Sequence, residues 1–568
     1  MIAGVGRPLR GLVLVILALG FLLPILAGLF ETMRAGFGYF PALGAKEYSL
    51  EPWRQLLALP GLGTSLRLTL SVGIAATALS LVLAFTLCSA LHGRRRGLIL
   101  EKLLTPLLAA PHAAAAIGLA FVLAPSGWLA RLFSPWATGW TIPPDLAIVN
   151  DRWGLAIILG LMVKEVPYLL FVMLAALGQV RLADELKIGQ SLGYSRGMVW
   201  LKLIAPQVYP QIRLSVYVVL SFALSVVDVA MILGPGSPPT LAVSAMRWLT
   251  SPDVGLLLPA TAAAILQAVL VVLTIAAWWL AERLTIALGR GWIARGRRGK
   301  PGSEGRVMTS LALAVLLAGG LGLLAMALWS VAWHWPFPHA LPAVWTSGNW
   351  TRSAATLSGP LLNTILIGLT TACGATLLAI SWLETESKRS RGWSALLFLA
   401  IYVPLLLPQI TFLYGFDVFL NRFNLNGSLA AVIWAQALFV FPYVMLTLRD
   451  PWAALDGRYA RTASALGASP LRILLTVKIP LLLRPVLAAC AVGFSVSIAQ
   501  YLATLFMGEG RIATLTTEAV SLSSGADRRI AGVYATLQTA LPWAFYSLAI
   551  GLPALLHANR KGLGGARA

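Results

Sequence analysis

The chain has few charged residues and few cysteines. Only 11% of its 568 residues are charged, whereas about a quarter are charged in soluble globular domains. Acidic residues are the scarcer sign, with 21 Asp and Glu against 43 Lys and Arg. The three cysteines all fall in apolar stretches and have no paired spacing. These shortages exclude an ordinary soluble domain, a disulfide framework and a cysteine-based metal site.

A phosphate-binding loop of the form G-x-x-x-x-G-K-[ST] is also missing. The nearest candidate, Arg298-Gly299-Lys300-Pro301, has Pro where Ser or Thr would bind Mg²⁺, and it lacks the upstream Gly. The sequence also has no cluster of carboxylates or histidines at catalytic or metal-ligand spacing. We therefore expect no catalysis and no cofactor on this chain.

Long apolar runs dominate what is present. Hydrophobic residues make up 58% of the chain, and the mean hydropathy is +0.81. A helix needs about 20 apolar residues to cross the roughly 30 Å hydrocarbon core of a membrane. Runs of that length predict an all-α integral membrane protein with about 12 transmembrane helices, at 11–30, 64–90, 103–123, 154–177, 210–233, 256–282, 308–333, 361–382, 394–416, 428–448, 482–506 and 532–556.

Positive charge is distributed unevenly between the loops. If the N-terminus is cytoplasmic, the even-numbered loops and both termini hold most of the 43 Lys and Arg. Cytoplasmic loops of membrane proteins carry such an excess, so both termini are expected in the cytoplasm. Attraction to anionic lipid headgroups then explains the net charge of +22, and no nucleic-acid partner is expected.

The chain consists of two similar halves. A Gly- and Arg-rich segment without apolar periodicity, 285–307, predicts a basic cytoplasmic linker between repeats at 1–284 and 308–568. An offset of 274 residues aligns the last three helices of the halves, and one of 297 pairs Pro111 with Pro408. Because each half has six helices, the repeats are expected to be parallel, related by an axis along the membrane normal.

A polar segment occurs once in each half, between its fourth and fifth helices. It reads SLGYSRGMVWLKLIAPQVYP in the first half and ALGASPLRILLTVKIPLLLRP in the second. In each copy a Pro follows the Gly by 13 residues, as Gly193 with Pro206 and Gly467 with Pro480. The apolar spacing predicts short helices along the membrane face, opened by the Gly turn and closed by the Pro. One such helix fits binding to lipid headgroups equally well, but two copies at the same topological place favour a docking surface.

This segment resembles the signature loop of the permease subunits of ATP-binding-cassette importers, which has Glu-Ala-Ala, a Gly, a hydrophobic position and a Pro. The matching residues are Gly193, Ile204 and Pro206, then Gly467, Val477 and Pro480. The resemblance covers both halves, and it implies a fused type I permease that binds two cytoplasmic ATPase copies, one under each loop. It also implies ATP and Mg²⁺ on those partners, an extracytoplasmic solute-binding protein, and a multi-pass place in the bacterial inner membrane.

The loops depart from that family at the acidic position. Where the family usually has Glu-Ala-Ala, the chain has Lys187-Ile188-Gly189 and Arg461-Thr462-Ala463. A salt bridge from this position to a basic ATPase residue is therefore not expected. Instead, we expect acidic groups on the partner opposite four basic residues of the loops, Lys187, Arg196, Arg461 and Arg472.

Four residues within predicted spans are candidates to line the pathway. Charged groups at the membrane centre cost about 2.5 to 3.5 kcal/mol on insertion scales, so Glu165 needs a polar cavity or an internal ion pair. Asp228 and Gln500 lie in corresponding helices of the two halves, which border the pathway in the resembled family. Trp434 lies deep in the tenth span, where it serves either an aromatic cage for a cation or simple packing.

The substrate and the energy source have alternatives. The stretch 508–525 looks most like permeases of a thiamine-like system, which suggests thiamine or a related small solute. The alternative function is a major-facilitator-like secondary transporter driven by an ion gradient, because that family also has two parallel six-helix halves. Its basic loop between the second and third helices is faintly matched at 92–97, whereas the second half has acidic residues at the corresponding place, 384–389.

Overall fold

The protein is an all-α membrane protein in its computed structural model, which describes residues 6–92, 95–296, 298, 304–385, 401–525 and 527–556. In this part, ten helices are long and apolar enough to cross a membrane, and a pair of helices bent by 81° makes an eleventh span. These confirm the predicted fold class. The predicted ninth span, 394–416, lies partly outside the described residues.

The apolar runs form helices because only a helix or a closed barrel satisfies its backbone polar groups within lipid. The first half contains α1 (Gly6–Leu17), the π-helix η1 (Ala18–Leu22), α2 (Leu23–Gly36), η2 (Pro41–Leu43), α3 (Glu51–Ala58), α4 (Leu62–Leu91), α5 (Arg95–Ala109), α6 (His112–Leu123), α7 (Trp128–Phe133), α8 (Leu155–Leu177), α9 (Leu182–Ser191), α10 (Arg196–Val199), the π-helix η3 (Trp200–Ile204), α11 (Ala205–Ser225), α12 (Asp228–Leu233), α13 (Leu241–Leu249), η4 (Val254–Leu256) and α14 (Leu257–Ala294).

The described part of the second half repeats the order of the long helices of the first half and has a short β-hairpin after its first helix. It contains α15 (Glu304–Ser330), β1 (Ala332–His334), β2 (Val344–Trp345), α16 (Gly348–Thr385), α18 (Gln409–Asn421), α19 (Leu429–Ala454), α20 (Gly457–Ala465), α21 (Pro470–Ile473), the π-helix η5 (Leu474–Lys478), α22 (Ile479–Leu481), α23 (Leu483–Ile498), α24 (Leu502–Gly508), α25 (Leu515–Ser523) and α26 (Arg528–Leu556).

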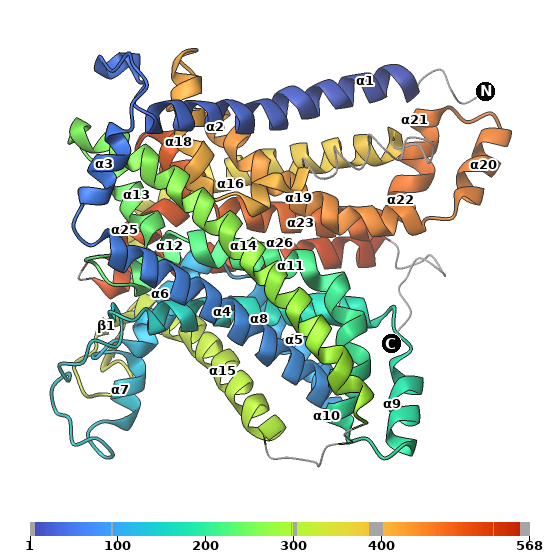
Figure 1. The fold of residues 1–568 in the computed structure, drawn as a ribbon, viewed down its shortest axis with the longest axis horizontal. Coiled ribbons are helices and arrows are strands. Elements are labelled where there is room, and N and C mark those ends of the chain that lie inside the picture. The colour runs from blue at the N-terminus through green and yellow to red at the C-terminus, as the bar shows by residue number, and fades with distance from the viewer. Residues whose placement is uncertain are drawn as a thin grey trace.

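The first membrane helix of each half packs on the other half. Figure 1 shows α1 and α2 beside α16 and α18, and α15 beside α4, α5 and α8. Both crossings are backbone to backbone at glycines. A Cβ on Gly415 of α18 would overlap the carbonyl oxygen of Gly28 in α2, and a Cβ on Gly118 of α6 would overlap that of Gly322 in α15. Gly118 and Gly415 are 297 residues apart, so the two crossings are equivalent, and small residues allow the close approach.

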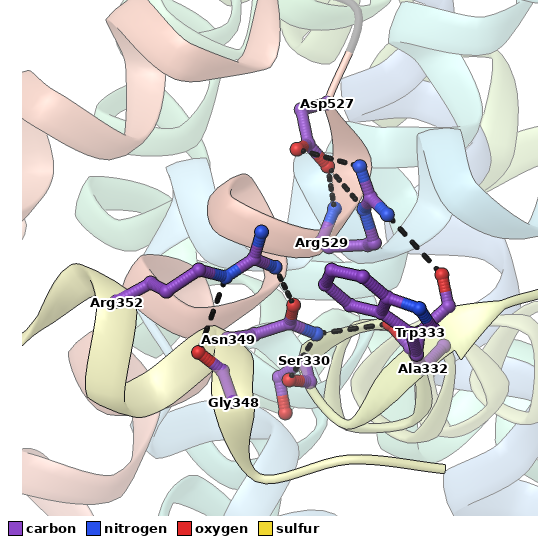
Figure 2. A network of polar contacts seen from close by, with 8 residues as sticks. All are labelled: Ser330, Ala332, Trp333, Gly348, Asn349, Arg352, Asp527 and Arg529. Carbon is purple, nitrogen blue, oxygen red and sulfur yellow. Dashed lines mark hydrogen bonds and ion pairs between the residues drawn. The ribbon is translucent and has the colours of Figure 1, made fainter. Parts of the chain in front are cut away.

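The two ends of the bundle differ. The polar loops with α9, α10, α20 and α21 lie at one end, here called the loop end (Figure 1). At the other, the hairpin end, lie α3, α7 and the antiparallel β1–β2 hairpin. Buried Asn349 holds this hairpin by donating to the carbonyls of Ser330 and Ala332 at 3.0 and 2.9 Å, and Arg529 donates to the carbonyl of Trp333 at 3.1 Å (Figure 2).

The prediction that a Pro closes each short loop helix is wrong. Pro206 lies at the start of α11, and Pro480 lies inside α22. A π-helix precedes each Pro, and Ala205, the residue before Pro206, donates its N–H to the carbonyl of Trp200, one residue farther back than in an α-helix. The wider turn accommodates a residue that has no N–H, so the helix continues. The second copy bends later, at Leu482, because Pro485 cannot continue the ladder.

Candidate functional site

Two helices of each half are interrupted inside the bundle. In the first half, Pro111 separates α5 from α6, and two residues separate α11 from α12. In the second half, Pro408 precedes α18, and a short segment that includes Gln500 separates α23 from α24. A Pro cannot donate to the helix ladder, which explains two of these breaks. Interrupted backbone at membrane depth is tolerated where it is buried in protein or lines a cavity.

A cavity of about 150 Å³ lies between the halves at these four breaks. Residues of α11, α12, α19, α23 and α24 form its wall together with the segment 404–409 and the first residue of α6. The polar groups in the wall come from both halves, and they are His112, Ser221, Ser225, Asp228, Gln409, Tyr443, Gln500 and Tyr501. The structure therefore brings together two of the four predicted pathway residues, Asp228 and Gln500.

Asp228 is the carboxylate of this wall. It is the first residue of α12, its side chain is only 8% exposed, and its carboxylate accepts hydrogen bonds from the backbone N–H groups of Asp228 and Val229. An acidic residue at a helix start satisfies otherwise unpaired donors and complements the helix dipole. Phe222 of α11 lies before the break between α11 and α12. Its ring packs against that of His112 with the ring centroids 4.6 Å apart.

Gln500 belongs to a network of amides and hydroxyls in the second half. Gln409 donates to its side-chain oxygen at 3.3 Å. Nearby, Ser497 donates to the side-chain oxygen of Gln436, whose amide donates to Thr504 at 2.9 Å. These bonds join α18, α19, α23 and α24, so the break at Gln500 is held by uncharged polar groups.

Glu165 and its neighbour Lys164 contact opposite sides of the break at Pro111. The Lys164 ammonium donates to the carbonyls of Leu107, Leu108 and Ala110 at 2.9, 2.8 and 2.5 Å, and so caps the end of α5. The Glu165 carboxylate lies 3.6 Å from the ring nitrogen Nε2 of His112, at the start of α6. Glu165 thus stands behind His112 and is not among the residues that line the cavity.

Trp434 has a packing partner and is also not among the lining residues. Its indole N–H donates to the carbonyl of Gly20 at 2.7 Å, and its ring stands edge-on to Phe416 with centroids 5.4 Å apart. Gly20 lies in the π-helix η1, where the wider turn exposes backbone carbonyls. Trp434 therefore fastens the first helix of one half to the other half.

The sequence did not indicate every lining residue. Gln409 and Tyr501 sit next to breaks, and their position after Pro408 and Gln500 was the available signal. Ser221 donates across the halves to the carbonyl of Leu406, just before the break at Pro408.

The two polar loops have the same backbone geometry. Gly193 and Gly467 have φ of +81° and +82°, a conformation that favours glycine. Each Gly donates to the residue three positions earlier, and the residue after it donates five positions back, as is usual at a helix end. All these positions are 274 residues apart, so the loops are structural repeats.

The four basic loop residues have different surroundings. Lys187, Arg461 and Arg472 are exposed. Arg196 is half-buried, because its guanidinium donates to the carbonyls of Ser89 and His92, both at 3.0 Å, at the end of α4. In the second loop, half-buried Asp456 caps the start of α20, and hydrogen bonds from the backbone and side chain of Arg458 lower the pKa of Asp456.

A pair of leucines stands at the tips of the loops. Leu192 and Leu466, which precede the two glycines, are 57% and 83% exposed. The signal for them was in the sequence, since the Leu-Gly pair is repeated in both copies. A large apolar side chain held in solvent on a rigid turn is suited to insertion into an apolar cleft.

Comparison with known proteins gives relatives of one kind. No family model matches the chain. The chain is 35% identical over 500 residues to the inner membrane ABC transporter permease protein YnjC of Escherichia coli, which covers 88% of this chain and 90% of that protein. It is 26% identical over 453 residues to the thiamine transport system permease protein ThiP of Salmonella typhimurium, covering 77% and 79%. It is 27% identical over 184 residues to the molybdenum transport system permease protein ModB of Mycobacterium tuberculosis, covering 29% and 68%.

Proposed function

The chain belongs to the family of ABC transporter permeases, and we propose that it is the fused membrane subunit of an ATP-driven importer for a small solute. The observation that carries the proposal is the pair of loops with one backbone geometry, Gly193 and Gly467, placed at the same end of the bundle. A permease that works with two ATPase copies needs two equivalent docking sites. This chain supplies both.

The pathway runs between the halves through the cavity at the four helix breaks. ATP binding draws the two ATPases together, and the loops transmit that movement to α11 and α23, which follow them in the chain. The breaks at Pro111 and Pro408 divide the helices that would otherwise close the cavity. No covalent step occurs on this chain, and ATP and Mg²⁺ are bound by the partners.

The partners and the location follow from the same family. We expect two copies of a cytoplasmic ATPase at the loop end and a solute-binding protein at the hairpin end. The chain is a multi-pass membrane protein, and the relative from Escherichia coli is named as an inner membrane permease, which supports the bacterial inner membrane. The loop end is then cytoplasmic, as the distribution of Lys and Arg predicts.

Thiamine or a related small solute is the substrate that we propose. The support is the relative from Salmonella typhimurium, which is named as a thiamine transport permease and matches 77% of this chain. YnjC, ThiP and ModB are all named as permeases and none as a secondary transporter, so the alternative of an ion-driven transporter gains no support.

Co-purification and transport test the proposal together. The chain is produced with the ATPase and binding protein encoded beside it, and it is purified through a tag on the chain alone. We expect two ATPases per chain, ATP hydrolysis by the complex, and uptake of labelled thiamine into proteoliposomes that requires ATP on the loop side. Uptake driven by an ion gradient without a bound ATPase would overturn the proposal.

A further inference from the structure

Among the described residues, the cavity between the halves is lined by one carboxylate and one imidazole, those of Asp228 and His112. No Lys or Arg is among the residues that form its wall. Asp228 is buried there, and among the described residues it forms no ion pair. Its hydrogen bonds come from backbone N–H groups of its own helix start, and His112 is the titratable side chain that acts on it electrostatically. A buried carboxylate without a Lys or Arg partner is costly, so such a group in a membrane protein marks a functional site.

The nearby charges do not supply the missing countercharge. Lys164 donates its ammonium to three backbone carbonyls at the end of α5, and it is not among the residues that line the cavity. Glu165 adds a second negative charge, which lies against His112. Lys164, Glu165 and Asp228 together provide two carboxylates and one ammonium, and the single imidazole of His112 lies close to both carboxylates. A cation in the cavity is attracted by the carboxylate of Asp228, which repels an anion.

Aromatic rings form much of the rest of the wall. Phe222, Phe439, Tyr443 and Tyr501 line it. Faces of such rings attract organic cations, most strongly when water is excluded. A volume of about 150 Å³ is also the size of cavity that holds one benzene ring. The cavity in this conformation therefore has room for one ring of a cation, such as one of the two rings of thiamine, or for a short chain that bears a positive charge.

The charge is present in only one half. Residue 502, which is 274 positions after Asp228, is a leucine that also lines the cavity. On that side, the polar groups are the amides of Gln409 and Gln500 and the hydroxyls of Tyr443 and Tyr501, and none of them is a carboxylate. The two sides of the cavity are therefore chemically different, and they orient a solute with its cationic end toward α12 and a hydrogen-bonding end toward α23 and α24.

We propose that this cavity is a binding site for a small organic cation, with Asp228 as the countercharge, and that it rejects oxyanions such as molybdate. The inference rests on the proposed function, because it concerns the same pathway, and it names the class of substrate that the pathway accepts. It also separates the chain from its relatives that are named for molybdenum transport.

Equilibrium binding to the permease–ATPase complex tests the site directly. The complex is placed in lipid nanodiscs without nucleotide and without binding protein, so that only the membrane subunit selects the solute. Labelled thiamine is the probe, and unlabelled putrescine and molybdate are the competitors. We expect thiamine to bind, putrescine to compete and molybdate to leave the binding unchanged.

Two variants locate the charge. Asp228→Asn keeps the shape of the side chain and removes its charge, so thiamine affinity should fall by about tenfold or more. Asp417→Asn removes another carboxylate of a membrane helix, one that is not among the lining residues, and should leave the affinity unchanged. Asp228→Glu, which keeps the charge, should retain the preference for cations even if Asp228→Asn lowers the yield of folded protein.

Three results would overturn the inference. They are molybdate competing as well as putrescine, Asp228→Asn binding thiamine as the unchanged chain does, and neither cation binding at millimolar concentration. ATP-dependent uptake by the complete system is measured separately. If uptake persists while cation binding is absent, this inference alone fails, and loss of ATP-dependent uptake in the unchanged complex would instead refute the proposed function.

Discussion

The ammonium of Lys164 donates to the carbonyl oxygen of Ala110 at 2.5 Å, at the point where Pro111 interrupts the third membrane helix. The last carbonyls of a helix have no partner within the helix, and water does not satisfy them inside the bundle. A buried cation at the carbonyl end also complements the helix dipole. Lys164 is therefore the group that makes the break at Pro111 tolerable.

Replacement of Lys164 by Met should destabilise the protein. The change removes a charged donor from three buried carbonyls, and a loss of about 1 to 3 kcal/mol in the free energy of unfolding is expected. Thermal unfolding of the purified chain measures the effect. Lys187→Met, at an exposed position of α9, is the control and should unfold as the unchanged chain does. Equal unfolding temperatures for both variants would show that other donors serve these carbonyls.

Charge reversal at Arg196 and at Arg472 should have different effects on stability and on ATPase activity, although both residues were predicted to face the ATPase. Arg196→Glu removes two hydrogen bonds to the end of α4 and places a carboxylate beside carbonyl oxygens, so the unfolding temperature should fall. Arg472→Glu lies on an exposed surface, and it should leave unfolding unchanged. If the partner's cleft is acidic, Arg472→Glu should lower the ATPase activity of the complex.

The opposite pattern would contradict this assignment. A stable Arg196→Glu protein with reduced ATPase activity would place Arg196 in the contact with the partner. Unaltered activity in Arg472→Glu would mean that the partner offers no acidic group to the second loop. Both variants are compared at one salt concentration, because exposed charge interactions are screened by salt.

Much of this architecture could be predicted from local sequence. Apolar runs of membrane length gave the spans, since a helix in lipid depends on the composition of its own segment. Proline at 111 and 408 indicated two of the four breaks. The repeated Leu-Gly pair located both loops, because the turn requires a positive φ at Gly193 and Gly467.

Contacts between distant segments could not be predicted in this way. The indole N–H of Trp434 donates to the carbonyl of Gly20, which is 414 residues away, and the local sequence of neither segment indicates this contact. Lys164 and Glu165 are adjacent, yet side chains of neighbours on a helix point about 100° apart. Lys164 therefore contacts the end of α5, and Glu165 contacts the start of α6. The packing of each first helix on the other half could not be predicted either. Hydropathy indicates that a segment lies in lipid, but it does not indicate which helices pack together.

The exposed leucines at the loop tips should contribute to ATPase binding. Full burial of a Leu side chain stabilises a complex by about 1.5 to 3 kcal/mol, which is roughly tenfold or more in affinity. Leu192→Ser and Leu466→Ser should each weaken binding of the ATPase to that extent, measured by titration of the purified subunit. Leu57→Ser is the control, since Leu57 is 71% exposed on α3 at the hairpin end. Unchanged affinity in both loop variants would show that the leucines do not enter the partner.

The glycine crossing between α6 and α15 should tolerate no side chain. A Cβ at Gly118 would overlap the carbonyl oxygen of Gly322, so Gly118→Ala forces the first helix of the second half away from the first half. Overpacking of this kind costs on the order of 1 to 3 kcal/mol. Gly320→Ala is the matched control on α15, because its Cβ would meet no atom within 4 Å and replacing a helical Gly by Ala stabilises by up to about 1 kcal/mol. Thermal unfolding should therefore move in opposite directions for the two variants, and Gly415→Ala, at the equivalent crossing, should behave like Gly118→Ala. Equal unfolding temperatures for Gly118→Ala and Gly320→Ala would show that the helices can separate at no cost and that this crossing does not hold the halves together.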